Sequence, residues 1–107
     1  MNAFTVDIST HLEDSPKFVK LGPTDKDVFK VDDRKNTVLK IQEILNHDQS
    51  AKSINKALEL ALGREAVKRI EDMELSITAF QNVFIGVMAA MNSKTFEETE
   101  KDFRNIR

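Results

Sequence analysis

The chain has 107 residues, which is enough for one compact domain and short for two, so we expect a single domain over 1–107. Its 16 basic and 18 acidic residues leave a formal net charge of −2, which argues against a large one-sign field for nucleic-acid or membrane binding. The sequence contains no cysteine, and this excludes disulfides, thiolate chemistry and cysteine-ligated metal sites.

The first third of the chain, 1–32, has the pattern of a β-rich lead-in. Residues 4–8 alternate apolar and polar side chains, which is typical of a strand with one buried face. Two further strands are predicted over 17–21 and 28–31, and the glycine, proline, threonine and aspartate at 22–25 favour a turn between them. We therefore expect a small antiparallel sheet or hairpin.

From residue 33 onward the apolar residues recur with a helical period, which predicts a bundle of four or five helices. Ser50 or Ser53 is expected to cap the second helix, and Gly63 stands where a left-handed C-terminal cap would end it. Thr95 and Glu98 have the spacing of a capping box at the start of the last helix. The expected helices cover 35–46, 50–62, 64–72, 76–92 and 95–107. The fold class is thus α+β, mainly α.

The helix expected over 76–92 is apolar almost all round, so it must be covered on several sides. It is either the central helix of the bundle or, in part, a contact surface for another protein. The candidate protein-contact residues are Phe84, Ile85, Met88 and Met91. Gly86 within this helix would allow a close approach of another helix. The last helix carries a narrower stripe, Phe96, Phe103 and Ile106, and is expected to lie on the surface.

The residues that carry chemistry are sparse, and we expect neither an enzyme nor a cofactor or metal site. His11 and His47 fall in predicted loops without converging ligands, so both are read as solvated side chains. Acidic residues on the last helix are interleaved with basic ones, as on an exposed, weakly salt-bridged face. No nucleophile motif or glycine-rich phosphate loop is present. Helices two and three, with Gly63 between them, leave a small DNA-binding regulator as one alternative, although Glu65 and Glu71 offset the basic side chains.

The region from Lys56 to Arg104 contains four stretches and a closing pair that form one arrangement: Ala61-Leu62-Gly63-Arg64-Glu65-Ala66, Ile70-Glu71-Asp72-Met73-Glu74-Leu75-Ser76, Phe84-Ile85-Gly86-Val87-Met88-Ala89-Ala90-Met91, Thr95-Phe96-Glu97-Glu98 and Phe103-Arg104. In this arrangement the region resembles the tail assembly chaperones, small helical proteins encoded in the tail-gene modules of long-tailed bacteriophages and prophages.

This resemblance implies a non-enzymatic protein that binds the long helical tape-measure protein before the tail tube forms around it. It transfers no catalytic residue. Self-association through the same apolar surface and another adaptor role in a phage or bacterium remain open alternatives. The start of the chain has no basic segment followed by a long apolar run, so we expect a soluble protein of the bacterial host cytoplasm, with no membrane partner.

Overall fold

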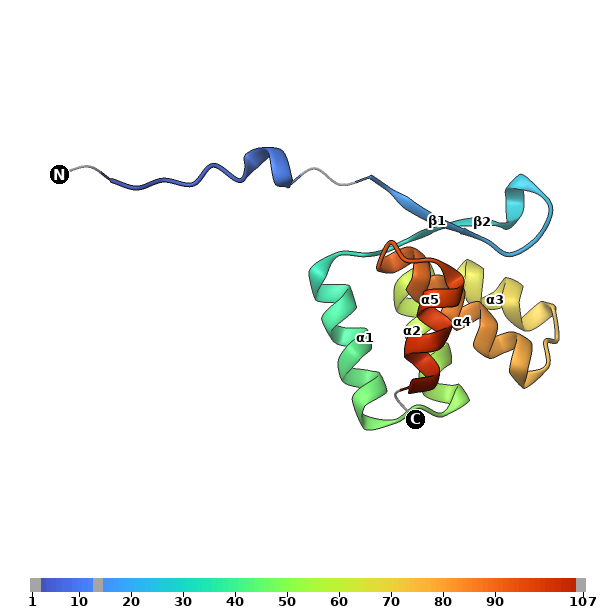
Figure 1. Ribbon diagram of the computed structural model, residues 1–107. Helices are drawn as coiled ribbons and strands as arrows, with labels where there is room; N and C mark the ends of the chain where they lie inside the picture. The colour runs from blue at the N-terminus through green and yellow to red at the C-terminus, as the bar shows by residue number, and fades with distance from the viewer. Residues whose placement is uncertain (1–2, 13–14, 106–107) are drawn as a thin grey trace.

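The computed structural model describes residues 3–12 and 15–105, the last three of them by backbone alone. It confirms the predicted class, because a two-stranded antiparallel hairpin is followed by five helices (Figure 1). The strands are β1 (Lys17–Lys20) and β2 (Val28–Val31), and the helices are α1 (Lys35–His47), α2 (Ala51–Leu62), α3 (Arg64–Asp72), α4 (Ile77–Met91) and α5 (Phe96–Asn105). Short 3-10 turns, η1 (Ser9–His11) and η2 (Asp25–Asp27), precede β1 and β2.

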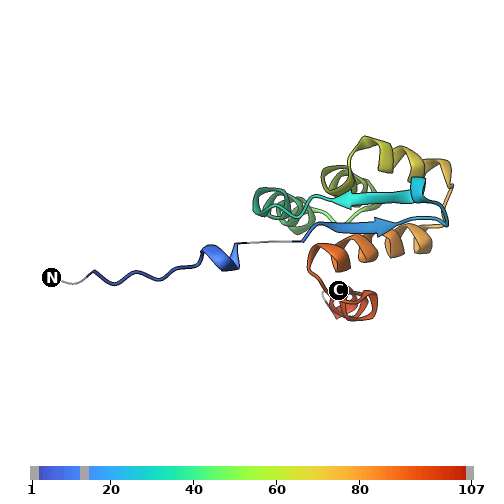
Figure 2. The same ribbon diagram turned by 90° about the horizontal axis from the view of Figure 1, so that it is seen from above.

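The hairpin lies across one end of the helices and turns one face toward them (Figures 1 and 2). Val19 pairs with Phe29, and Lys17 pairs with Val31, so these residues share the inner face. Val31 is buried, and Phe18 on the outer face is half-exposed. Seen from above, α4 and α5 lie on the β1 side of the hairpin, and α2 and α3 lie on the β2 side (Figure 2).

Side-chain caps mark the starts of α2, α4 and α5. The Ser50 and Ser76 hydroxyls accept hydrogen bonds from backbone N–H groups in the first turns of α2 and α4. Thr95 and Glu98 form the predicted capping box: each backbone N–H donates to the other's side chain at 3.1 Å. The starts predicted from these serines and from Thr95 are therefore confirmed.

Gly63 is the single residue between α2 and α3, and its backbone has φ 92° and ψ 171°. The positive φ agrees with the sequence prediction, but the extended ψ does not, because a left-handed cap has a ψ near +47°. The difference arises because the same residue is also the N-cap of α3. The chain must turn at once into a new helix, and glycine reaches this backbone region without a steric penalty.

Helix α4 is the central element, packing against α5, α2 and both strands. Its Phe84, Val87 and Met91 are buried, and α2 contributes Leu58, which has no exposed surface. The fully buried core residues are Val31, Ile41, Ile54, Ala57, Leu58, Ala61, Val67, Ile70, Phe84, Val87 and Met91. A cluster that draws on one strand and four helices explains why α4 must be apolar on most sides.

Two expectations are wrong. Residues 4–8 do not form the predicted strand, and Phe4, which was expected on its buried face, is 93% exposed. The alternating pattern is present, but no strand within 3–12 or 15–105 pairs with it. At Gly86, an added Cβ would meet no atom within 4 Å, so the glycine serves no close helix contact within the chain.

Candidate protein-contact groove

An apolar groove opens where α1, α2, α4 and α5 meet. Ile54, Phe84 and Met88 form its floor, and Leu45 of α1 forms an apolar wall. The groove has a volume of about 250 Å³. Sites for small molecules usually enclose roughly 300–1,000 Å³. The groove therefore suits a few side chains of a partner protein better than a drug-sized ligand.

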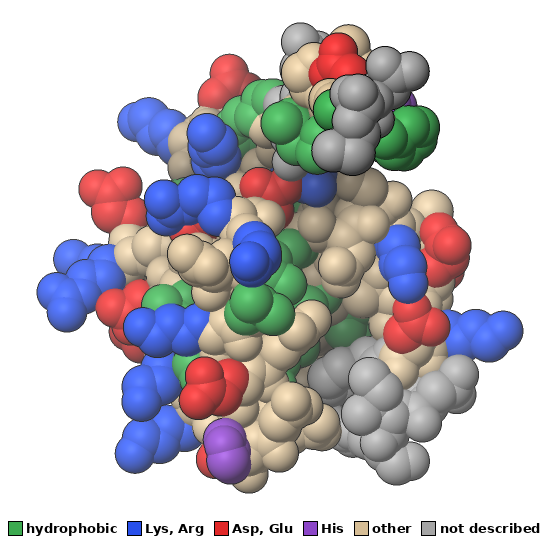
Figure 3. Space-filling model, turned by 90° about the vertical axis from the view of Figure 1, so that its left-hand side faces the viewer, with side chains coloured by type: hydrophobic (Ala, Val, Ile, Leu, Met, Phe, Trp, Pro, Cys, Tyr) green, Lys and Arg blue, Asp and Glu red, His purple; other side chains and the backbone are tan. Residues whose placement is uncertain are grey.

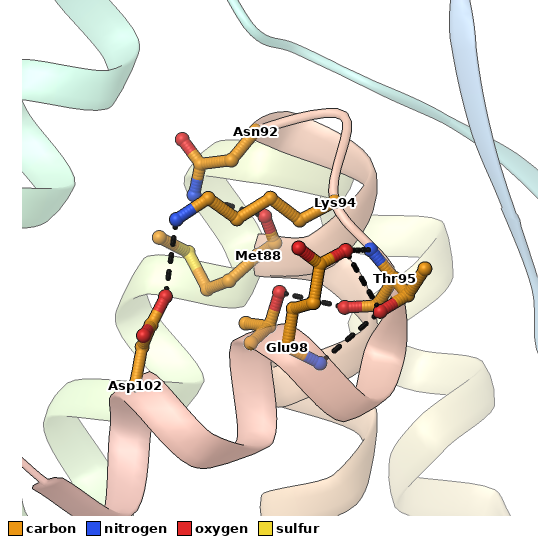
Figure 4. Close-up of polar contacts among 7 residues, drawn as sticks. Met88, Asn92, Lys94, Thr95, Glu98 and Asp102 are labelled. Carbon is orange, nitrogen blue, oxygen red and sulfur yellow. Dashed lines mark hydrogen bonds and ion pairs between the residues drawn. The ribbon is translucent and has the colours of Figure 1, made fainter.

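Polar side chains hold the corner between α4 and α5 at one rim of the groove (Figure 4). The Asn92 side-chain amide donates to the Met88 carbonyl at 3.0 Å. Lys94 Nζ lies 3.0 Å from Asp102 Oδ2, and this pair is half-exposed, so it contributes little to the free energy of unfolding. Asp102 is the one charged side chain among the described residues that line the groove, and Lys94 neutralises it.

The first turn of α5 is fixed by the capping box described above. The Thr95 backbone N–H, and then its hydroxyl, hold the pKa of the Glu98 carboxyl below its usual value. One turn on, the Thr99 hydroxyl donates to the Thr95 carbonyl at 3.0 Å, and Thr99 is a buried polar residue facing the groove. Its hydroxyl is therefore satisfied within the helix, and the groove wall needs no water there.

The opposite rim is set by the corner between α1 and α2. Asp48 accepts hydrogen bonds from the Ser50 and Ser53 hydroxyls at 2.8 and 2.9 Å and from the Ser50 backbone N–H at 2.9 Å. The Ser50 hydroxyl is the main reason that the pKa of the Asp48 carboxyl is lowered. Gln49, within this tied corner, lines the groove. Hydrogen bonds thus fix the backbone at both rims. The polar side chains that the rims present to the groove are either uncharged, as Gln49 is, or neutralised by an ion pair, as Asp102 is.

The structure separates the four predicted contact residues. Phe84, Ile85 and Met91 have exposed fractions of 3–4%, so each is an interior side chain of the isolated chain. Phe84 nevertheless reaches the floor of the groove, and the partly buried Met88 lines it as well. Met88 is therefore the predicted residue best placed for contact with another protein. Sequence reasoning did not identify two other residues that line the groove, Leu45 and Ile54, as contact candidates.

Charge is distributed unevenly around α1. Figure 3 looks at the molecule from the α1 side, and Lys and Arg side chains gather along one margin while hydrophobic side chains show near the centre. Lys40, Lys56 and Arg64 border an open hollow between α1 and α2. Arg64 is paired with Glu59 at 3.2 Å, so part of this basic margin is neutralised.

A buried carboxylate, Asp27, was not singled out from the sequence. It accepts hydrogen bonds from the Thr24 hydroxyl at 2.8 Å and from Arg69 Nε of α3 at 3.0 Å, and 4% of its surface is exposed. The Thr24 hydroxyl, followed by Arg69, lowers the pKa of Asp27. A Cβ at Gly22 would approach Asp27 Oδ2, so glycine leaves the room that the carboxylate needs. The arrangement is that of an anchor between the hairpin turn and α3, since its charge is paired.

Replacing Asp27 by asparagine is expected to lower the free energy of unfolding at pH 7 and to weaken its dependence on acid. Because the folded-state pKa lies below the unfolded value of about 3.9, the carboxylate stabilises the fold above that value. This stabilisation is lost as the pH falls through the folded pKa. Urea titrations at pH 7 and at lower pH measure both effects. Asp25→Asn, at an exposed position of the same turn, is the matched control, and an equal loss in both variants would contradict the anchor.

The remaining polar side chains that the structure describes form no further site. His11 and His47 are exposed, and the described residues hold no cluster of metal-ligating side chains. The α2–α3 corner has a one-residue link where a helix-turn-helix uses three or four residues, and Arg69 is held by Asp27. These features do not favour α3 as a DNA-recognition helix.

Comparisons of the chain with protein-family models, with curated proteins and with solved structures return no match. Within the part of the chain that the structure describes, no helix is long and apolar enough to cross a bilayer.

Proposed function

We propose that this chain is a non-enzymatic assembly chaperone that holds an apolar helical segment of a partner protein in the host cytoplasm. The observation that carries the proposal is the groove with Phe84 and Met88 in its floor. Amphipathic helices dock by seating apolar side chains from successive turns in such grooves. The resemblance of residues 56–104 to tail assembly chaperones favours the tape-measure protein of a phage tail as that partner.

The side chains of the groove suit a partner that binds and is later released. Met88 is unbranched and polarisable, so it adapts to side chains of different shape. The exposed Gln42 and Asn46 at the mouth carry no charge. A groove of this size gives an interface at the small end of the range, below about 1,200 Å², where complexes are weak and transient. Transient binding is what a chaperone of tail assembly requires.

The test is co-expression with the candidate tape-measure protein, followed by an affinity measurement. We expect a soluble complex with the unmodified chain and about ten-fold weaker binding by Asn46→Arg, because the longer cation obstructs the mouth of an apolar groove. Asn46 is exposed, so the variant should fold normally.

Asn36→Arg is the matched control, since it makes the same change at an exposed position of α1 that does not line the groove. Circular dichroism checks that both variants keep their helix content. Failure to obtain a complex, or equal binding by the two variants, would overturn the proposal.

A further inference from the structure

The N-terminal arm, residues 3–12, carries the alternating pattern of a strand over residues 4–8, but none of the described residues forms a strand beside it. Phe4, Val6 and Ile8 recur at every second position, so an extended chain places them on one face. Their exposed fractions are 93%, 65% and 55%. The arm runs away from the helices (Figures 1 and 2). An apolar stripe exposed in this way marks a contact surface.

In the part of the chain that the structure describes, no strand lies on the outer edge of β1, so this edge can accept another strand. The Leu21 N–H donates to the Asp27 carbonyl at 2.8 Å immediately beyond the hairpin. Antiparallel alternation then directs the backbone groups of Val19 toward β2 and those of Phe18 and Lys20 toward the outer edge. Such an edge is a template for pairing with a further chain, and a two-stranded sheet gains most from a third strand.

An apolar groove runs beneath this edge, between β1 and α4, with a volume of about 360 Å³. We call it the β1-edge groove. Its described lining includes Val19, Leu21, Leu75, Val83, Gly86 and Phe96. Gly86 exposes bare helix backbone there, with open space where a side chain would stand. A strand added to β1 would cover this groove and would approach α4 closely at Gly86.

We propose that the arm of one copy of this chain adds as a strand to the β1 edge of a second copy. Phe4, Val6 and Ile8 then fill the β1-edge groove. The alternation of the strand turns Asp7 to the opposite face, which carries the exposed Lys20. The charges of Asp7 and Lys20 are opposite, and such cross-strand pairs stabilise a sheet. The alternating pattern of the arm, the outer edge of β1, the β1-edge groove and the opposite charges of Asp7 and Lys20 therefore all favour this placement of the arm.

Reciprocal exchange between two copies explains the direction of the arm. A two-fold axis perpendicular to the strands makes each arm antiparallel to the partner's β1, and both arms stay extended. Pairing with the arm's own β1 would instead need a chain reversal between Ile8 and Lys17. Exchange produces two equivalent contacts, so their buried areas add toward the total of roughly 1,600 Å² that a stable dimer buries.

Sedimentation of the full chain over a range of concentrations tests the proposal. We expect a monomer–dimer equilibrium that Val6→Asp weakens about ten-fold or more, because the charge enters an apolar groove. Val6 is exposed in one chain, so the monomer should remain folded. Thr5→Asp is the matched control, because it places the same charge on the opposite face of the arm, which carries Lys20, and it should not weaken the equilibrium. Gly86→Gln, which fills the groove from its floor, should weaken it as Val6→Asp does.

Cross-linking distinguishes exchange between copies from folding back within one chain. Because the sequence contains no cysteine, an Asp7→Cys chain can be mixed with a Lys20→Cys chain, which places the two thiols at the proposed cross-strand pair. We expect a disulfide-linked pair of the two variants under mild oxidation. The proposal would be overturned by a chain that stays monomeric at all concentrations, or by a dimer that survives both Val6→Asp and Gly86→Gln. It would also be overturned if a chain carrying both cysteine substitutions formed the disulfide within itself while the mixed, singly substituted chains formed none.

Discussion

Replacing Phe84 by alanine is expected to lower the free energy of unfolding by about 3–5 kcal/mol. The side chain is 3% exposed and belongs to the core cluster that joins α4 to α2 and the hairpin. Its removal loses the free energy gained by burying an aromatic ring. It also leaves a cavity, which the hydrogen-bonded α1–α2 and α4–α5 connections prevent the helices from closing fully. Urea denaturation followed by circular dichroism measures the change. Domains of this size have a total stability of about 5–15 kcal/mol, so the variant should be close to unfolding at 37 °C.

Leu39→Ala is the matched control for Phe84→Ala, because Leu39 is an apolar side chain that is 51% exposed on α1. We expect this control to change the free energy of unfolding by no more than about 0.5 kcal/mol. If Phe84→Ala unfolded no more easily than Leu39→Ala, the ring would be a contact side chain rather than a core one. The sequence left this choice open, and the burial of Phe84 favours the core.

Local signals were sufficient to predict the hairpin and the helices. The turn residues at 22–25 joined two short β runs, and the structure pairs those runs as β1 and β2. A serine or threonine before each apolar repeat marked the starts of α2, α4 and α5, where each hydroxyl accepts a hydrogen bond from the following turn. These signals act within four residues of one another, so they can be read without knowledge of the fold.

Features that depend on distant residues could not be predicted. The alternation in residues 4–8 was correct as a pattern, but a strand needs a partner, and sequence alone does not show whether one exists. The Asp27–Arg69 contact joins residues 42 positions apart, although the threonine three residues before Asp27 was a usable sign of a capping turn. The groove needs walls from four helices, so its shape follows from packing that no local period encodes.

The helical period of the apolar residues could not show which of the candidate contact residues are buried within the chain and which are exposed. On a helix that is apolar all round, the period does not distinguish the side facing the core from a side facing a partner. Ile85 and Met91 proved to be interior, and Met88 lies at the groove. The neighbours supplied by α1 and α5 decide between these positions. The exposed part of Met88 therefore could be identified only once those helices were placed.

The same glycine-to-alanine substitution is expected to act in opposite directions at two sites. Gly63→Ala should lower the free energy of unfolding by about 1–3 kcal/mol, because φ 92° with ψ 171° is a backbone region that is essentially restricted to glycine. Gly86→Ala should raise it by about 0.5–1 kcal/mol, because alanine has the higher helix propensity. Neither added Cβ meets an atom within 4 Å, so steric clashes do not complicate the comparison.

Thermal and urea denaturation of the two variants, at a concentration where the chain is monomeric, measure this pair of effects. A difference of 1 kcal/mol corresponds to a shift in Tm of about 4–8 °C for a domain of this length, so the two variants should melt well apart. Equal stability of Gly63→Ala and the unmodified chain would mean that the α2–α3 link relaxes to another backbone conformation. That relaxation would move α3, and with it Arg69, away from Asp27, so the acid dependence of unfolding would change in the same variant.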